Sequence, residues 1–363
     1  GVAINCLVEN NEATGNGGGV YLHNIGQLHN SIVRNNVCKK DVGGIDIAAA
    51  GGAVYNCLVV GNHADGNIGG VQARKANNVV NTTIVGNSHN TTDETRIVWA
   101  GFRASSNTEG DYNGKLFVNN VIWGNKHNGE VVAEQVMTYL KHYVSKGTFA
   151  NNALQGTTDI NATYIALSTE NDPQFNEDYS FTWTSPLYNA GSNEAIAKIL
   201  GDKDVYGNAR KQGANIEIGA VEHTEYTATV ELGEGGTLEV DYTGEKTPLV
   251  AGEISVPAGF TTKLYVTPAE NYALETITLN GEALVAEEGV YTIPAVAGNI
   301  TLKVEFDCDL YKVAAGEDLQ AAVDNADAGD TILVQAGTYE GNFTMKDGVY
   351  VSGGWNEDFT AQT

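Results

Sequence analysis

The sequence is poor in basic side chains. It has 20 Lys and Arg against 45 Asp and Glu, which gives a formal net charge of −25. Nucleic-acid binding needs a basic surface, so this balance argues against a nucleic-acid partner. No apolar run approaches the roughly 18 residues of a membrane-crossing helix, and no membrane span is predicted. The four cysteines form no CxxC pair, so no metal site is predicted.

What the sequence has instead is an asparagine repeat. Two asparagines six positions apart recur in the segments 5–11, 30–36, 56–62, 81–87 and 119–125. The steps between the first asparagines are 25, 26, 25 and 38 residues, so the last repeat carries an insertion. A degenerate sixth copy begins at Asn151. Self-similarity of this kind is typical of a solenoid, in which each repeat packs on the next.

Each repeat contains three short apolar runs, which predict three strands per coil. One run follows the first asparagine, one follows a Gly-Gly or Ala-Gly pair, and one ends just before the next repeat. The predicted fold is all-β: a right-handed parallel β-helix with about 25 residues per coil. Because the chain begins inside a repeat at Gly1, we interpret it as a fragment whose signal peptide and anchor lie outside it.

Alternation of side chains along each strand assigns the faces of the predicted coil. One inward column has small residues: Cys6, Ser31, Cys57, Thr82 and Asn120. Cys6 and Cys57 are a whole coil apart, roughly 9.6 Å, which is too far for a disulfide. We expect the repeated asparagines to stack as amide ladders at the corners and to adopt the left-handed backbone there. These structural residues are Asn5, Asn30, Asn56, Asn81, Asn119, Asn11, Asn36, Asn62, Asn87 and Asn125.

The outward column of the run after the glycine pair holds the candidate functional residues. The candidate ligand-binding residues of this column and its edge are Tyr21, Asp46, Gln72, Lys75 and Arg103, with Arg74 beside them. An Asp next to basic groups is suited to bind an acidic sugar and abstract a proton, so Asp46, Arg74 and Arg103 are the candidate catalytic residues. We favour a solvated polar face instead, because the column has one carboxylate and glycoside hydrolysis normally needs two.

Two other outward columns are unusually apolar. They comprise Leu7, Ile32, Leu58, Thr83 and Val121, and Glu9, Arg34, Val60, Val85 and Trp123. We expect the insertion at 126–150, the middle of the chain or a ligand to cover them, which makes Trp123 a further ligand-binding candidate.

Three histidines follow the second asparagines by one or two residues: His63, His89 and His127. Gathered at one edge, they would bind a metal ion. Loop histidines are more often solvated, and we favour that interpretation here.

Residues 172–222 close this part of the chain with an ordered series of motifs. They read Asp172-Pro-Gln-Phe175, Asp178-Tyr-Ser-Phe181, Ser185-Pro-Leu-Tyr-Asn-Ala-Gly191, Asp202-Lys-Asp-Val-Tyr-Gly-Asn-Ala-Arg210 and Ile216-Glu-Ile-Gly-Ala-Val-Glu222. The series resembles the C-terminal end of bacterial right-handed β-helix repeat proteins of the choice-of-anchor type. It departs from their pattern at Leu187-Tyr188, where an apolar-acidic pair is usual. The resemblance implies a secreted or surface-attached protein and no single activity.

Asp202, Asp204 and Gly207 are spaced like the start of a calcium loop, and the acidic composition permits calcium. An EF-hand needs Glu at the twelfth position, where this chain has Gly213. A turn held by Asp side chains is therefore favoured, and no cofactor is predicted.

After Glu222 the sequence pattern changes: apolar and polar residues alternate, as in strands, between turn signals such as Asn280-Gly281. With the segments Val266-Thr-Pro-Ala-Glu-Asn-Tyr272 and Asn299-Ile-Thr-Leu-Lys-Val-Glu-Phe306, this stretch resembles a divergent internalin-type B-repeat. Such modules usually act as spacers or binding domains in surface proteins.

In the last part of the chain the pattern of apolar residues predicts a short amphipathic helix at 316–326. Strands are predicted after it at 331–334 and 349–352. This order resembles the N-terminal start of a right-handed β-helix, whose helix covers the open end of the coil. The helix either begins a second, truncated solenoid or folds back over the first coil at Gly1. We favour the first arrangement, which predicts few contacts between residues 308–363 and 1–30. The predicted domains are 1–223, 224–307 and 308–363.

Two functional hypotheses follow. The leading one is a non-catalytic secreted or cell-surface bacterial protein, an adhesin or stalk that binds a polysaccharide or a host or cell-surface protein. The alternative is a polysaccharide lyase or glycoside hydrolase that acts on acidic polysaccharide through the outward face. The sequence has no HExxH, GxSxG, P-loop or complete GxGxxG. β-Helix lyases use none of these motifs, so their absence does not separate the two hypotheses.

Overall fold

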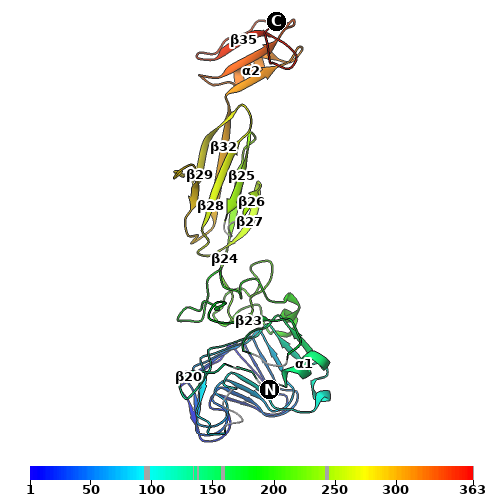
Figure 1. Cartoon of the computed structure of the whole chain (residues 1–363), viewed down its shortest axis with the longest axis vertical. Helices are drawn as coiled ribbons and strands as arrows, with labels where there is room; N and C mark the ends of the chain where they lie inside the picture. The colour runs from blue at the N-terminus through cyan, green and yellow to red at the C-terminus, as the bar shows by residue number, and fades with distance from the viewer. Residues whose placement is uncertain (94–98, 134, 137–138, 157–159, 242–244, 363) are drawn as a thin grey trace. The chain divides into compact units, whose positions relative to one another are not determined.

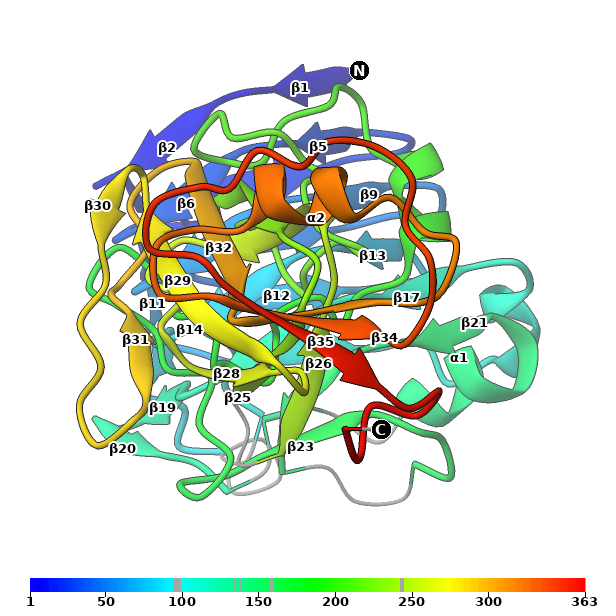
Figure 2. The same ribbon diagram turned by 90° about the horizontal axis from the view of Figure 1, so that it is seen from above.

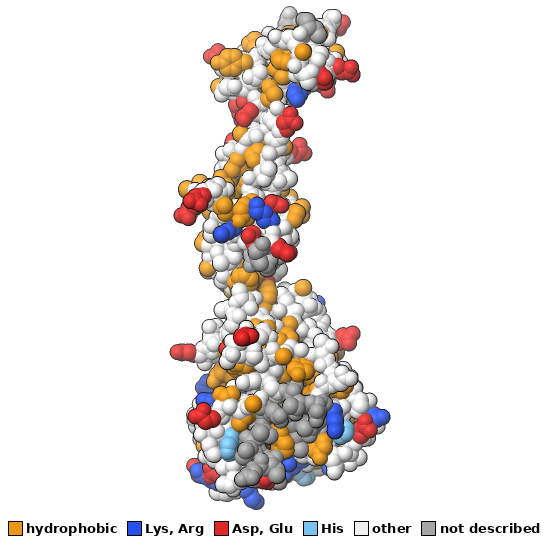
Figure 3. All heavy atoms as spheres, in the orientation of Figure 1, with side chains coloured by type: hydrophobic (Ala, Val, Ile, Leu, Met, Phe, Trp, Pro, Cys, Tyr) orange, Lys and Arg blue, Asp and Glu red, His pale blue; other side chains and the backbone are white. Residues whose placement is uncertain are grey.

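The computed structural model describes residues 1–363 except 94–98, 134, 137–138, 157–159, 242–244 and 363. Strands dominate the chain, which divides into two compact units, residues 1–224 and 225–363 (Figure 1). Acidic side chains are scattered over both units, in keeping with the net charge (Figure 3).

Short strands of the first unit form four sheets, named here in the order in which the chain reaches them. The first sheet comprises β1 (Val2–Ile4), β5 (Gln27–His29), β9 (Ala53–Tyr55), β13 (Asn78–Val80), β17 (Leu116–Val118) and β21 (Thr148–Ala150). The second comprises β2 (Leu7–Glu9), β6 (Ile32–Arg34), β10 (Leu58–Val60), β14 (Thr83–Val85), β18 (Val121–Trp123), β22 (Ala153–Gln155) and β23 (Ile165–Leu167). The third comprises β3 (Glu12–Ala13), β7 (Val37–Cys38), β11 (His63–Ala64), β15 (Ser88–His89), β19 (Lys126–His127) and β20 (Glu130–Val131). The fourth comprises β4 (Val20–Leu22), β8 (Ile45–Ile47), β12 (Val71–Ala73) and β16 (Phe102–Ala104).

Strands of successive repeats pair in parallel, so equivalent residues lie side by side; Figure 2 shows β1, β5, β9 and β13 in this order. The predicted alignment of the repeats is confirmed: Val59, for example, pairs with Val33 and Ile84. The sixth copy is present too, because Ala153 pairs with Val121. The stacked parallel sheets are compatible with a β-helix-like fold.

The number of strands differs from the prediction of three per coil. A two-residue strand, such as Val37–Cys38, follows the second asparagine of each early repeat and forms the third sheet. Two residues are too few to show an alternating pattern in the sequence. The strands of the third sheet were therefore not predicted.

The second asparagine of each repeat forms a ladder, which is buried except at its exposed first member, Asn11. These inner asparagines are Asn11, Asn36, Asn62, Asn87 and Asn125. The Nδ2 of each donates to the Oδ1 of the next at 2.9 Å, and the same oxygen accepts the backbone N–H of its neighbour. Gln135 continues the ladder, because its Oε1 accepts the backbone N–H of Asn125 at 2.9 Å. The predicted amide ladder is confirmed for this column.

The first asparagine of each repeat has a different role. These corner asparagines, Asn5, Asn30, Asn56, Asn81 and Asn119, have φ between 47 and 56°. The left-handed backbone predicted for the repeated asparagines is confirmed for these five and is wrong for the inner asparagines, none of which has a positive φ. Asn56 Nδ2 donates to Asn30 Oδ1 at 2.7 Å, as a ladder requires, but it also donates to the carbonyl of Lys203 at 3.0 Å. The corner side chains therefore also bind a distant part of the chain.

An apolar core lies between the sheets of the first unit. Its buried residues include Val33, Ile45, Val59, Val71, Ile84, Phe102, Phe117 and Ile122. Cys57 is completely buried, and burial raises the pKa of its thiol to about 12. Its thiol and that of Cys6 are free, as the spacing predicts. Further along the same column Asn120 Nδ2 donates to Asn152 Oδ1 at 3.1 Å, so the small residues give way to a second ladder.

The insertion contributes to this core. It contains α1 (Leu140–Lys146), while the 3-10 helix η1 (Glu109–Tyr112) precedes β17. Leu140 and Tyr143 are fully buried in the core, and the Tyr143 hydroxyl donates to the carbonyl of Asn77 at 2.5 Å. The insertion thus fills the interior beyond the fourth sheet, which has fewer strands than the other three.

Residues 172–222, the closing segment, cover most of the apolar outward columns. They contain the 3-10 helix η2 (Asn193–Lys198). Val205 and Ala220 pack on Leu58 and Val60 of the second sheet. Other residues of the segment pack on the first sheet and on the end of the second: Ala195 and Ile199, and Phe181, Leu187 and Ile218. The closing segment, rather than the insertion at 126–150, therefore covers much of these columns, while Leu7 at their start is 54% exposed.

The second unit begins with two mostly antiparallel sheets. One comprises β24 (Glu225–Leu232), β27 (Gly252–Pro257), β29 (Tyr272–Leu279), β30 (Glu282–Ala283) and β32 (Ile300–Cys308). The other comprises β25 (Gly236–Asp241), β26 (Lys246–Leu249), β28 (Thr262–Pro268) and β31 (Tyr291–Ile293). Their apolar faces share one core, with Leu238, Leu264 and Leu302 buried.

A small parallel sheet follows, with β33 (Leu310–Val313), β34 (Thr331–Gln335) and β35 (Tyr350–Trp355) in sequence order. The predicted helix is α2 (Leu319–Asn325), which lies between β33 and β34 in the sequence. Its Val323 is buried with Val313, Ile332 and Val334. β35 pairs with β34, so the two predicted strands adjoin each other within this unit.

Candidate functional site

The polar column of the fourth sheet lies as the repeat predicts. Tyr21 pairs with Asp46, Asp46 with Gln72, and Gln72 with Arg103. Aligned residues of adjacent strands point to the same side, so the four side chains share one outward face. Their exposure differs sharply: Tyr21 is 48% exposed, whereas Asp46 and Gln72 are buried.

Arg74 binds the carboxylate of Asp46 with two nitrogens. Nε lies 2.9 and 3.0 Å from the two oxygens, and Nη2 lies 2.8 Å from Oδ2. Asp41 adds a second carboxylate 3.5 Å from the same Nη2. The hydrogen bonds to Asp46 raise the pKa of Arg74. Because the Asp46 side chain has 0% exposure, this arrangement holds a charge pair together and offers no accessible base.

The other half of the column comprises Gln72, which is buried, and Arg103, which is half-buried. Gln72 Nε2 donates to Ser105 Oγ at 3.1 Å, while its Oε1 is buried without a partner in the described part of the chain. The Arg103 guanidinium lies 6.0 Å from the centre of the Trp99 ring, within the range of a cation–π interaction. Arg103 is two strands away from Asp46. The structure therefore joins two of the three candidate catalytic residues and leaves Arg103 apart.

The remaining sequence candidates lie outside the column. Lys75 Nζ is 3.9 Å from Asp111 Oδ2 in an exposed ion pair. Trp123 belongs to β18 of the second sheet and packs against the closing segment. The structure thus does not bring Trp123 to the face that contains Tyr21.

Two of the three candidate histidines come together. His89 and His127 are aligned in β15 and β19, with ring centroids 4.9 Å apart. His63 aligns with Ser88, the residue before His89, and so points to the other side of the sheet. His89 is completely buried, and burial, with a smaller effect of His127, lowers its pKa to about 4. The expectation that these histidines are solvated is wrong for His89.

Sequence reasoning missed a buried charge cluster in the closing segment. Arg210 is 1% exposed; its Nη1 lies 3.0 Å from Glu222 Oε1, and its Nη2 donates to the carbonyl of Gly219 at 2.5 Å. Burial lowers the pKa of Arg210 to about 10, although the charges of Glu217 and Asp204 act in the opposite direction. Buried charges need partners. The fixed order of Asp, Arg and Glu motifs in the sequence was the available signal.

Asp204 holds a turn, as predicted in preference to a calcium loop. Its Oδ1 accepts the backbone N–H groups of Tyr206 at 2.9 Å and Asn208 at 2.8 Å. Its Oδ2 accepts the backbone N–H of Glu222 at 3.0 Å. The carboxylate therefore joins the turn at 204–208 to Glu222 at the end of the closing segment.

The second unit contains three clustered carboxylates, Asp307, Asp309 and Asp330, with ligand atoms within 4.8 Å of one another. Oxygen atoms of this kind suit a hard cation such as calcium. Asp330 Oδ2 already accepts the backbone N–H of Asp327 at 2.7 Å. The cluster alone does not define a binding site.

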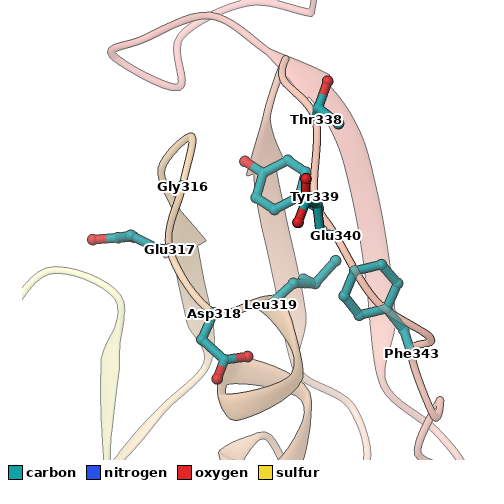
Figure 4. Close-up of a pocket in the computed structure, with 8 residues that line it drawn as sticks. All are labelled: Gly316, Glu317, Asp318, Leu319, Thr338, Tyr339, Glu340 and Phe343. Carbon is teal, nitrogen blue, oxygen red and sulfur yellow. The ribbon is translucent and has the colours of Figure 1, made fainter.

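A hollow beside α2 has polar and aromatic walls (Figure 4). It is lined by Gly316, Glu317, Asp318, Leu319, Thr338, Tyr339, Glu340 and Phe343. Asp318 caps α2 by accepting the N–H of Ala321 at 3.2 Å, and the Tyr339 hydroxyl donates to the carbonyl of Gln335 at 3.0 Å. In Figure 4 the Glu317 side chain points away from the hollow. The polar side chains around the hollow therefore stabilise the local fold.

In the described part of the chain, no helix has both the length and the apolar character needed to cross a membrane. Comparison with known proteins gave no matching family, no matching curated protein and no matching solved structure.

Proposed function

We propose that residues 1–223 form the last coils of a right-handed parallel β-helix in a secreted or cell-surface bacterial protein, an adhesin or stalk without catalytic activity. The parallel pairing of equivalent strands, the inner asparagine ladder and the closing motifs support this proposal. A stack of this kind presents long, regular outward faces, which suits recognition of an extended ligand. The proposed ligand is a polysaccharide or a host or cell-surface protein.

The state of Asp46 is the observation that carries the non-catalytic part of the proposal. Proton abstraction needs a carboxylate within hydrogen-bond reach of the substrate. Asp46 has no exposed surface, and Arg74 engages both of its oxygens. Arg74 would have to move away, leaving a buried charge unpaired, before Asp46 met a sugar.

Tyr21 and Arg103 mark the part of the face that is proposed to bind the ligand. Tyr21 is 48% exposed at one end of the column, and an exposed aromatic ring is suited to stack on a sugar ring. Arg103 at the other end carries positive charge beside the Trp99 ring. A ligand that reaches both must span the four strands from β4 to β16.

An activity assay separates this proposal from the lyase or hydrolase alternative. Purified protein is incubated with a panel of acidic polysaccharides, and unsaturated or reducing sugars are measured. We expect no release. Release that is lost in Asp46→Asn and kept in Asp65→Asn, a matched exposed carboxylate of the same unit, would establish the enzyme and reject the proposal.

A glycan and protein binding screen tests the positive part. We expect Tyr21→Ala and Arg103→Ala each to weaken binding of any ligand found with the unchanged protein. Tyr350→Ala is the matched control, since Tyr350 is 67% exposed in the other unit. Equal binding by all three variants would place the ligand elsewhere and reject the face as the site.

A further inference from the structure

The third sheet contains buried imidazole nitrogens that lack a well-aligned hydrogen-bond partner among the described residues. His89 is completely buried, and its ring nitrogens make no hydrogen bond of standard geometry with the described residues, although an interaction with the backbone of Gly66 acts to raise its pKa. The Nδ1 of His127 is also buried without a partner there. Unsatisfied buried polar atoms are rare because each costs about 1–3 kcal/mol, and an ion or water is a common explanation. Such atoms on two adjacent rings call for a shared partner.

We propose that His89 and His127 bind one divalent transition-metal ion of the zinc type, with Glu130 as a third ligand. Imidazole is the preferred ligand of such ions, and a carboxylate commonly completes the set. Each residue lies on a different strand of the third sheet, in the order β15, β19 and β20.

Strand register places the three residues on one side of the sheet. His89 is the aligned partner of His127, and His127 is the aligned partner of Glu130 across the β19–β20 hairpin. Aligned residues share a face, so the three side chains form one row. The hairpin turn is Asn128-Gly129, with φ of 48 and 88°, the left-handed values of a tight two-residue turn. This turn is what brings Glu130 back beside His127.

The ring geometry suits a common ion. Two nitrogens bound to one tetrahedral zinc ion lie roughly 3.3 Å apart, given bonds of about 2.0–2.1 Å. Ring centroids 4.9 Å apart, tilted by 46°, allow that spacing after small side-chain rotations. Glu130 is exposed, so its carboxylate is able to rotate toward the pair.

A neighbouring amide can hold His127 in the tautomer that the site requires. Binding through His127 Nδ1 requires the proton on Nε2. That nitrogen lies 3.0 Å from the Asn128 amide nitrogen, and a half-turn of this exposed amide presents its oxygen as the acceptor instead.

His63 provides a matched control within the same sheet. Its Nδ1 lies 2.8 Å from Ser88 Oγ, and its Nε2 lies 3.3 Å from Asp65 Oδ1. It points to the opposite side from His89. A histidine on the same sheet, already engaged, should therefore be dispensable for metal binding.

The test is titration of the EDTA-treated, dialysed full chain with ZnCl2 by isothermal calorimetry, with equilibrium dialysis for the stoichiometry. We expect one ion per chain and a higher melting temperature in the presence of zinc. His89→Ala and His127→Ala should each lower the affinity by at least about 100-fold, which exceeds the usual effect of a supporting residue. Glu130→Gln should lower it about 10-fold, and His63→Ala should change it less than about threefold.

His89→Ala is expected to fold, because the equivalent position of the preceding repeat is Ala64. Circular dichroism in EDTA checks this, and His127→Ala, at the more exposed end of the row, gives an independent answer. Absence of stoichiometric binding, unchanged affinity in both histidine variants, or an equal loss in His63→Ala would overturn the proposal. An unchanged affinity in Glu130→Gln would remove Glu130 from the site.

Discussion

The two asparagine columns of the first unit have the same residue and the same spacing, yet they do different things. The inner asparagines bond to one another, and each amide satisfies its neighbours in the adjacent repeats. The corner asparagines adopt a left-handed backbone, and their side chains reach the closing segment: Asn30 donates to the carbonyl of Leu200 and Asn119 to that of Ser192.

The two columns differ in how far along the chain their hydrogen-bond partners lie. Inner partners are one repeat away, for example 26 residues between Asn36 and Asn62. Corner partners are as far as 170 residues away, between Asn30 and Leu200. The inner column therefore stabilises the stack of repeats itself. The corner column instead holds the closing segment against the apolar outer faces of the stack. Substitutions that separate these two effects test the distinction.

The largest expected effect on stability comes from the buried charge cluster of the closing segment. Arg210→Ala leaves Glu222 buried without its ion-pair partner, and we expect the free energy of unfolding to fall by about 3–5 kcal/mol. Chemical denaturation measures it. Lys211→Ala, at the exposed neighbouring residue, should change stability by less than about 0.5 kcal/mol. A loss below about 1 kcal/mol in Arg210→Ala would contradict the assigned role of the cluster.

Next comes the inner ladder. Asn62→Ala removes the acceptor of two groups on Asn36 and the donor to Asn87, all of them buried, and should cost about 2–4 kcal/mol. Thermal and denaturant unfolding give the value. The control is Asn16→Ala, an exposed asparagine of the same unit, which should be nearly neutral. A similar loss of stability in both variants would mean that the ladder does not contribute to stability beyond an exposed asparagine.

His89, two residues beyond an inner asparagine, should make stability depend on pH. Its pKa of about 4 in the folded chain lies below the ordinary 6.5, so the unfolded chain binds the proton more tightly. Stability is then complete above pH 6.5 and is lost as the pH falls toward 4, by up to about 3 kcal/mol in metal-free buffer. Unfolding of the unchanged protein and of His89→Ala is compared across this range. Identical pH profiles would show that His89 is not buried in its neutral form.

The smallest effect is expected at a corner. Asn56→Ala loses the hydrogen bonds to Asn30 and Lys203 and places Ala in the left-handed backbone, which should cost about 1–3 kcal/mol. Asn56→Gly loses the same bonds but tolerates the backbone, so it should recover roughly 1 kcal/mol. The melting temperatures of the two variants check this. Unchanged stability in Asn56→Ala would argue against the corner role.

Much of the first unit was predictable from local pattern. The recurrence of asparagines aligns the repeats, and alternation places Tyr21, Asp46, Gln72 and Arg103 in one column, as the register shows. The chemistry of that column was not predictable to the same degree. Arg74 stands in the sequence as a free basic group, but in the fold it lies over Asp46 and neutralises it. Alternation gives the side on which a residue lies and not the reach of a long side chain.

The candidate metal site shows the same limit. His63 follows its inner asparagine by one residue, whereas His89 and His127 follow theirs by two, and this difference sends His63 to one side of the sheet and His89 to the other. Because strand side chains alternate, an offset of one residue reverses the face. The offset in the sequence therefore separates His63 from the other two, whereas the burial of His89 and the return of Glu130 beside His127 depend on the tertiary structure.

By itself, the sequence determined the repeat, its register and the left-handed corners, because these depend on contacts between a residue and its equivalent one repeat away. Only the tertiary structure decided what covers the stack, which carboxylate is neutralised and which histidines are buried together. Those features join residues such as Asn30 and Leu200, or Arg210 and Glu222, through an irregular segment that has no period of its own. Periodicity reports interactions that recur, whereas a contact made once leaves no repeating signal in the sequence.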